Sequence, residues 1–113
     1  MSHRIFARWV DDPFESPITL DARLSATHRV VGQWALFGAA GLRTPHCRPF
    51  SLDAEGCMDF GEGRVEGDRF WRTDIRSREI TLGATFIITW SGGESGVYRI
   101  EKIYEPGSKT GAE

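Results

Sequence analysis

The chain has 113 residues, a length typical of a single domain. Its 14 basic and 16 acidic residues give a net charge of -2, which excludes a general electrostatic attraction to nucleic acid or to anionic lipid. Hydrophobic residues make up 40% of the chain and aromatic residues 12%, so it can bury a core and is not disordered over most of its length.

Alternation of apolar and polar residues, which indicates a half-buried β-strand, begins near the N-terminus. Residues 4–10 alternate in this way, and so do residues 18–24. The second segment follows Ser16 and Pro17, which are typical of the cap and first turn of a helix. The sequence therefore leaves a strand and a short helix open as alternatives for residues 16–26.

Residues 30–42 form the longest uncharged apolar stretch, and their apolar side chains occupy both alternating positions. A strand that is apolar on both faces needs cover on both. We expect the cover to be residues 4–24 folded over the barrel, or otherwise a partner subunit. In the second case Val31, Ala35 and Phe37 would form an interface, either in a homodimer or with another protein.

Two short strands are expected over residues 50–60, joined by a turn at Asp53-Ala-Glu-Gly56 whose glycine takes a positive φ. Residues 69–75 are another strand candidate, with every second side chain from Trp71 to Ile75 on one face. Short strands with short connections are typical of an antiparallel sheet.

The clearest alternation predicts one long strand over residues 80–90. The glycine-rich residues 91–96 then supply a hairpin loop, and residues 97–104 return as the next strand with Tyr98 and Ile100 on its inner face. The apolar residues of this last strand also fit a helical spacing, but the hairpin loop favours a strand.

Seven or eight strands with short connections and no long helical pattern predict an all-β domain. We expect a small antiparallel meander barrel, with a sandwich as the second choice, because closure leaves no edge strand open to aggregation. The barrel would span residues 1–105, and the polar, glycine-rich residues 106–113 would form a flexible tail.

The N-terminus and the two cysteines bear on the cellular compartment. Arg4 and Arg8 interrupt any apolar run, so no signal-peptide core is visible, and residues 30–42 are too short to cross a bilayer. We therefore expect a cytoplasmic protein that makes no contact with membranes. Cys47 and Cys57 are then expected as reduced thiols rather than as a disulfide.

Several features between residues 30 and 104 resemble the lipocalin-like (calycin-type) group of small β-barrels. In chain order they are Val31-Gly32-Gln33-Trp34, Phe50-x-Leu52 ahead of the Asp53-to-Gly56 turn, Trp71 with Ile80-Thr-Leu82, and Tyr98-Arg-Ile100. The first is similar to the Gly-x-Trp start of the first barrel strand in that family. The resemblance implies that Trp34 packs under an arginine near the end of the barrel, and Arg99 is the candidate for this cation–π contact.

Metal binding and nucleic-acid binding are each suggested by a local cluster. A zinc site would join His28, His46, Cys47 and Cys57. Their spacing matches no usual pattern of paired ligands, so neither a metal nor another cofactor is expected. Residues 69–78 carry four arginines interleaved with aromatic side chains, an arrangement that would suit single-stranded nucleic acid. The acidic run before them would offset these charges across a strand pair, so this function is an alternative only.

A small hydrolase is the other alternative. It would need a cleft in which Asp59, Glu66 or a histidine meets a second polar group. The chain has 3 histidines and no Gly-x-Ser-x-Gly nucleophile elbow, so we assign no catalytic residue.

The aromatic side chains carry the main functional hypothesis, which is non-enzymatic binding. Five of them are expected to line a site for a small apolar ligand inside the barrel: Trp34, Trp71, Phe86, Trp90 and Tyr98. In a barrel this small the same rings would alternatively fill the interior and leave no cavity. The sequence leaves these two alternatives open.

Overall fold

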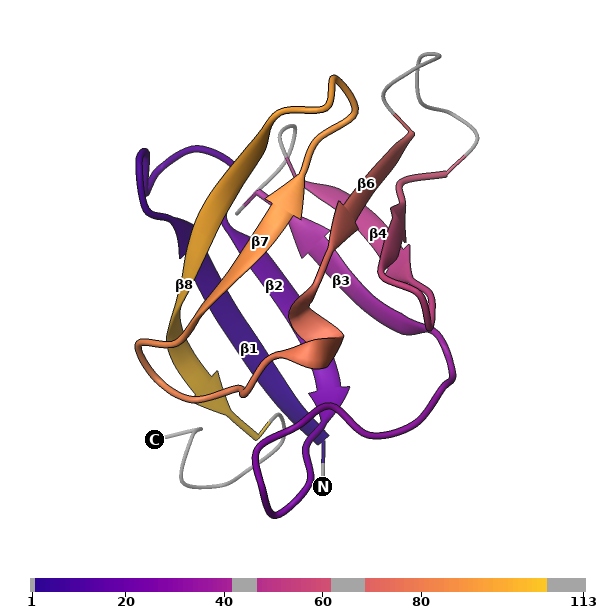
Figure 1. The fold of residues 1–113 in the computed structure, drawn as a ribbon, viewed down its shortest axis with the longest axis vertical. Coiled ribbons are helices and arrows are strands. Elements are labelled where there is room, and N and C mark those ends of the chain that lie inside the picture. Colours follow the sequence, from indigo (N-terminus) through magenta and orange to yellow (C-terminus); the bar gives the residue numbers. More distant parts are fainter. Residues whose placement is uncertain (1, 42–46, 62–68, 106–113) are drawn as a thin grey trace.

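The computed structural model of the chain describes residues 2–41, 47–61 and 69–105. Eight antiparallel strands close into a barrel, which confirms the predicted all-β class (Figure 1). The strands are β1 (Ser2–Trp9), β2 (Ile18–Arg23), β3 (Leu36–Ala40), β4 (Arg48–Leu52), β5 (Cys57–Asp59), β6 (Phe70–Thr73), β7 (Thr85–Thr89) and β8 (Ser95–Tyr104). One turn of 3₁₀ helix, η1 (Ile75–Ser77), is the only helix in the described residues, and none of them forms a helix that could span a membrane.

The strands follow one another in an up-and-down order. Each pairs with its neighbours in the chain, and β8 returns to pair with β1, so the barrel has no free edge. At one end, the terminal end, β1 begins and β8 finishes, beside the β2–β3 loop and η1 (Figure 1). At the opposite end lie the β1–β2 loop and the β7–β8 hairpin.

The N-terminal segment is part of the barrel wall. Residues 18–23 form a strand, so the short helix that the sequence left open there does not form. β2 pairs with β1 on one side and with β3 on the other. The expectation that residues 4–24 fold over the barrel as a cover is therefore wrong.

The apolar stretch 30–42 is not one long strand. In its described part only Leu36–Ala40 form a strand, β3, while residues 24–35 form a loop in which Val30 makes an isolated bridge with Leu24. Along β3 the alternation is ordinary, because the two end residues are buried and Phe37 is exposed. The apolar positions before β3 belong to the loop, so they do not make a strand that is apolar on both faces.

The long strand predicted for residues 80–90 is also shorter, since only Thr85–Thr89 pair as β7. Ile80 nevertheless lies in the core and is 1% exposed. Its N–H donates to the carbonyl oxygen of His28 at 2.7 Å, which ties the loop after η1 to the β2–β3 loop. This contact closes part of the terminal end of the barrel.

A β-bulge in β8 changes the alternation of its side chains. Two consecutive residues of β1 pair with Lys102 and Ile100, so Glu101 is skipped in the ladder. Ile100 is buried and Ile103, three positions on, also packs against the core. The bulge accounts for the helical spacing of the apolar residues in this segment.

Aromatic and branched side chains fill the centre of the barrel. Phe86 of β7 stacks on Tyr98 of β8 with ring centroids 5.8 Å apart, and both side chains are fully buried. A residual hollow beside Phe86, Leu20 and Ile88 measures about 10 Å³, which is at the lower limit for a single water molecule. Of the two alternatives for the interior, a core filled by side chains is the one found at the barrel's centre.

Candidate functional site

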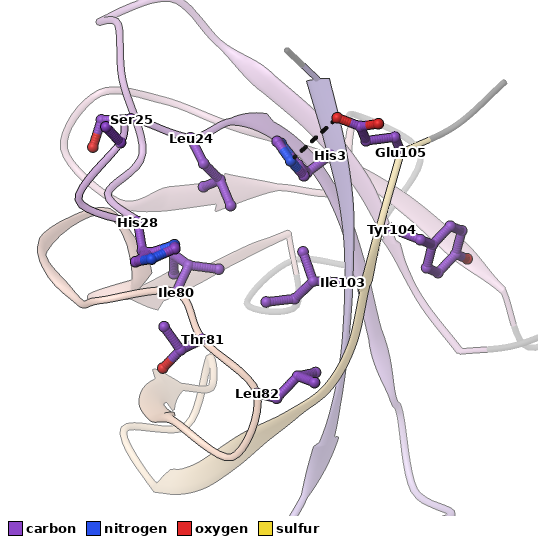
Figure 2. A pocket seen from close by; sticks show the side chains of 11 residues that line it. His3, Leu24, Ser25, His28, Ile80, Thr81, Leu82, Ile103, Tyr104 and Glu105 are labelled. Atoms are coloured by element: carbon purple, nitrogen blue, oxygen red, sulfur yellow. Dashed lines mark ion pairs between the residues drawn. The ribbon is translucent and has the colours of Figure 1, made fainter. Parts of the chain in front are cut away.

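Described residues line a hollow at each end of the barrel, and the one at the terminal end, of about 770 Å³, is the larger (Figure 2). We call it the terminal pocket and define it by six of its lining side chains: His3, Leu24, His28, Ile80, Ile103 and Glu105. They come from β1, the β2–β3 loop, the loop after η1, and the end of β8. Closure of the barrel therefore assembles the pocket from both ends of the sequence.

The floor of the terminal pocket is apolar. Leu24, Ile80 and Ile103 pack against the barrel core, with Ile80 buried and the other two half-buried. Figure 2 shows these three side chains facing the same space from separate segments. A molecule with an apolar body would remove the exposed part of this floor from water, which favours binding.

Polar side chains stand around the floor. His3 Nε2 lies 3.7 Å from Glu105 Oε2, and the two form an ion pair when the imidazole is protonated. In Figure 2 His28 lies across the apolar floor from this pair. An apolar floor with a few polar groups at its edge is the usual composition of a small-molecule site.

The turn that carries His28 is held by its own hydrogen bonds. Ser25 Oγ accepts the N–H groups of Thr27 at 3.2 Å and Arg29 at 3.1 Å, and it lies 2.9 Å from Thr27 Oγ1. His28 takes a φ of +65°, an uncommon value that histidine tolerates better than most side chains. The Ser25 hydroxyl thus serves the turn and is bonded to neither of the two described histidines, His3 and His28.

Arg76 of η1 anchors the β2–β3 loop, one wall of the terminal pocket. Its guanidinium donates to the carbonyl oxygens of Trp34 at 2.7 Å and Gly32 at 3.3 Å within that loop. It also donates to Asp53 O at 2.7 Å and Leu52 O at 3.2 Å, at the β4–β5 turn. Burial lowers the pKa of Arg76, because desolvation disfavours its charged form.

The second hollow, of about 310 Å³, lies at the end opposite the terminal pocket. We call it the tryptophan mouth, because the indoles of Trp9, Trp71 and Trp90 line it. Trp90 meets the other two edge-to-face, with centroid distances of 5.0 Å to Trp9 and 6.5 Å to Trp71. The other side chains lining it are Glu15, Ser16, Arg48, Glu94 and Tyr98.

Tyr98 connects the tryptophan mouth to the core. Its hydroxyl donates to the carbonyl oxygen of Ser16 in the β1–β2 loop at 3.1 Å. Burial raises the pKa of Tyr98 to about 12, while a hydrogen bond from Trp90 opposes this rise and the nearby Glu15 adds to it. The phenol is therefore neutral at physiological pH, and its proton is used in the hydrogen bond to the β1–β2 loop.

The structure brings together three of the five side chains predicted to line a ligand site. Trp71, Trp90 and Tyr98 meet at the tryptophan mouth. Phe86 lies in the filled core, and Trp34 is 52% exposed on the β2–β3 loop, at the terminal end. Trp34 is apart from the others because it precedes β3 instead of lying in it.

Sequence reasoning missed Trp9 as a site residue, and although it named His28 as a zinc candidate and Ile80 as a strand residue, it did not bring the residues of the terminal pocket together. Trp9 alternates with the buried Ile5 and Ala7, so the period-two pattern of the first strand contained a signal for it. His3 and Glu105 carried no such signal, because only the pairing of β1 with β8 places them side by side.

The cation–π contact implied by the lipocalin-like resemblance is not formed by the two residues named for it. The ring of Trp34 rests on Gly32, where a Cβ would collide with it, and its carbonyl oxygen accepts from Arg76. Arg99 is exposed on β8, and the cation–π contacts of the described residues include none between Trp34 and Arg99. The wider resemblance stays a prediction.

The predicted interface residues lie on the β2–β3 loop and on β3. Phe37 is 67% exposed and faces outward beside a shallow hollow bordered by Arg4 and Asp21. Ala35 is exposed, whereas Val31 is half-buried. An interface through these residues stays a prediction.

Internal partners engage three of the four arginines in residues 69–78. Arg69 forms a two-pronged ion pair with Asp59, at 2.8 and 3.1 Å, as expected for a strand pair that matches the acidic and basic runs. Arg78 pairs with Asp74, and Arg76 is the loop anchor described above. This use of their donors weakens the nucleic-acid alternative, because phosphate contacts would have to replace it.

Neither cysteine is part of a metal cluster in the described residues. Cys47 and Cys57 are free, half-buried thiols, and no group of three candidate ligands occurs in residues 2–41, 47–61 and 69–105. His46 and Glu66, which the zinc and hydrolase hypotheses named, lie outside the described residues.

Comparison with known proteins adds no relative. No protein-family model matches the chain, and neither the curated proteins nor the solved structures contain a match. The functional proposals below therefore depend on the structure of this chain, chiefly on the geometry of the two hollows.

Proposed function

We propose that the protein is a non-enzymatic binding protein that takes a small, largely apolar ligand in the terminal pocket. The observation that carries this proposal is the combination of a filled barrel centre with a hollow of about 770 Å³ at its end. A volume of this size suits a compact organic molecule. The ligand site is thus moved from the interior, where the sequence suggested it, to the terminal end of the barrel.

The polar rim suggests the form of the ligand. The pair of His3 and Glu105 offers a donor and an acceptor at one side of the apolar floor, and His28 offers an imidazole at the other. An apolar body with one hydrogen-bonding group would satisfy both features. The use of the Ser25 hydroxyl by its own turn argues against a nucleophile here and supports binding without catalysis.

The test is to block the pocket without disturbing the core. Ala26 is exposed and lines the terminal pocket, so Ala26→Trp would place a large ring in it. Ala54 is an exposed alanine on the β4–β5 turn and lines no hollow described here, so Ala54→Trp is the matched control. The probe is anilinonaphthalene sulfonate, whose fluorescence rises in an apolar site.

We expect the wild-type protein and Ala54→Trp to bind the probe alike, and Ala26→Trp to bind it at least about tenfold more weakly, because the loss of apolar burial amounts to more than about 1.4 kcal/mol. Equal binding by the two variants would contradict the proposal. So would a wild-type protein that leaves the fluorescence of the probe unchanged.

A second candidate function is binding of a protein partner, or of a second copy of the chain, through the outer face of β3. The supporting observation is Phe37, an outward-facing phenylalanine that is 67% exposed. Phe37→Asp should leave the fold intact and abolish an oligomer seen in native mass spectrometry. An oligomer that survives this substitution, or a wild-type protein that is monomeric and captures no partner, would remove this candidate.

A further inference from the structure

We propose that the tryptophan mouth is a second binding site, and that it takes a cationic group of the alkylammonium class, such as a quaternary ammonium. The site lies at the opposite end of the barrel from the terminal pocket, so the two proposals are independent. The inference depends on the orientation of the rings, on the hydrogen-bonding capacity left at the mouth, and on the charges there.

The indole of Trp90 is set at a steep angle to each of the other two indoles. The plane of Trp90 makes 72° with Trp9 and 82° with Trp71, so their electron-rich faces point in different directions around one hollow. Trp9 and Trp90 are both half-buried, which leaves part of each ring open to solvent. Several aromatic faces around one space are what a quaternary ammonium ion requires, because each face attracts the cation.

Two hydrogen-bond donors at the mouth, the phenol of Tyr98 and the indole of Trp90, are already in use. The hydroxyl of Tyr98 donates to Ser16 O, and the indole of Trp90 bonds to the Tyr98 side chain. The Nε1–H of Trp9 is buried without a hydrogen-bond partner among the described residues, and it lies 2.6 Å from the position that a Cβ on Gly96 would take, so it points at the backbone of β8. The phenol and these two indoles therefore offer a ligand their ring faces rather than accessible O–H or N–H groups.

Acceptors are available instead. Glu15 and Glu94 are exposed carboxylates that line the mouth, one from the β1–β2 loop and one from the β7–β8 hairpin. The backbone N–H of Trp90 donates to the backbone carbonyl oxygen of Glu94 at 2.7 Å, which closes the hairpin between these two residues. Two carboxylates against the single guanidinium of Arg48 give the described lining side chains a negative balance.

Arg48 shows that a cation already fits against this aromatic wall. Its guanidinium carbon lies 4.9 Å from the ring centroids of both Phe60 and Trp71, well within the range of a cation–π contact. Trp9 and Trp90 have no such internal cation in the described structure. The incoming ammonium group would contact these two rings and the carboxylates of Glu15 and Glu94.

The test compares choline with its neutral isostere, in which a quaternary carbon replaces the nitrogen. Binding is followed by the indole N–H signals of nitrogen-labelled protein in an NMR titration. The chain has 4 tryptophans, three at the mouth and Trp34 at the terminal end, so Trp34 is an internal control. Sodium chloride at matched concentration controls for ionic strength.

We expect choline to shift the signals of Trp9, Trp71 and Trp90 in a saturable way and to leave Trp34 unchanged. The isostere should bind about tenfold more weakly, since it keeps the shape but loses the cation–π and ionic attraction. Equal affinity for the two probes would overturn the proposal, and so would the absence of a saturable shift or an equal shift of Trp34.

Single-charge variants test the role of the carboxylates. Glu15→Gln and Glu94→Gln should each weaken choline binding about twofold to fivefold, because an exposed ion pair contributes little but not nothing. Glu55→Gln, at an exposed glutamate on the β4–β5 turn, is the matched control and should bind choline like the wild type. Unchanged affinity in both mouth variants would overturn the assignment of a cationic ligand.

Discussion

Removal of the Arg76 side chain is the substitution for which the structure predicts the largest single effect outside the core. The guanidinium donates four hydrogen bonds to carbonyl oxygens, at 2.7, 2.7, 3.2 and 3.3 Å. Because Arg76 is half-buried and pays a desolvation cost, each bond is counted near the lower end of the usual net value, about 0.5–1 kcal/mol. We therefore expect Arg76→Ala to reduce the free energy of unfolding by about 2–4 kcal/mol.

Urea unfolding followed by tryptophan fluorescence measures this loss. Arg72→Ala is the matched control, since Arg72 is an exposed arginine nearby on β6 and its removal should cost no more than about 0.5 kcal/mol. The Arg76→Lys variant keeps the positive charge, but its compact ammonium group has fewer donors than a guanidinium. Its free energy of unfolding should therefore lie between those of the wild type and Arg76→Ala.

Loss of the Arg76 side chain should also weaken ligand binding, because Arg76 holds the β2–β3 loop that forms one wall of the terminal pocket. Under conditions where Arg76→Ala is fully folded, it should bind the apolar probe more weakly than Arg72→Ala. A loss of less than about 1 kcal/mol, or a loss equal to that of Arg72→Ala, would refute the reasoning that the four bonds anchor the loop.

Three further predictions concern packing, alkaline pH and thiol reactivity. Gly96→Ala should cost about 1–3 kcal/mol, because its Cβ would lie 2.6 Å from atoms of two mouth indoles, whereas Gly92→Ala meets nothing within 4 Å and should be neutral in the same urea assay. The pKa of Tyr98 is raised from 10 to about 12, so its neutral phenol contributes about 2–3 kcal/mol to the free energy of unfolding below pH 10, and this contribution is lost as the pH rises to 12. A Tyr98→Phe variant whose stability falls equally between pH 10 and pH 12 would contradict this prediction. Burial raises the pKa of Cys57, so iodoacetamide should modify this thiol more slowly than it modifies free cysteine at about pH 8. Mass spectrometry of the Cys47→Ser variant measures the rate, and a rate equal to that of free cysteine would contradict the prediction.

Local chemistry made the hairpin of residues 50–60 predictable. The Asp53 carboxylate accepts the N–H groups of Glu55 and Cys57, both at 2.9 Å, and Gly56 takes a φ of +94° that a side chain would strain. All these interactions lie within five residues of the chain. The turn therefore forms as the sequence predicts, whatever the rest of the barrel does.

Strand length was not predictable in the same way. The alternation that begins at Ile80 continues without a break into β7, yet Ile80 reaches the core from a loop that is tied to His28. The pattern records which side chains are buried, but it does not record whether their backbone pairs with a neighbouring strand. The same limit applies to the apolar residues before β3.

The candidate sites were predictable only where they follow strand alternation. Trp71 and Tyr98 were placed correctly on inner faces, and the closed barrel then brought them to one end. The terminal pocket depends on His3 and Glu105, which meet through the pairing of the first and last strands. Contacts between such distant residues follow from topology, which composition and periodicity do not specify.

The most direct test of the central claim is native mass spectrometry of the wild-type protein and of Ala26→Trp, each after incubation with an organic extract of the host cell. Binding in the terminal pocket predicts a small-molecule mass that is added to the wild-type protein and is missing from the variant, whereas a cation held at the tryptophan mouth would add its mass to both proteins. A wild-type protein without added mass, or a set of added masses that is identical on the two proteins, would contradict the account.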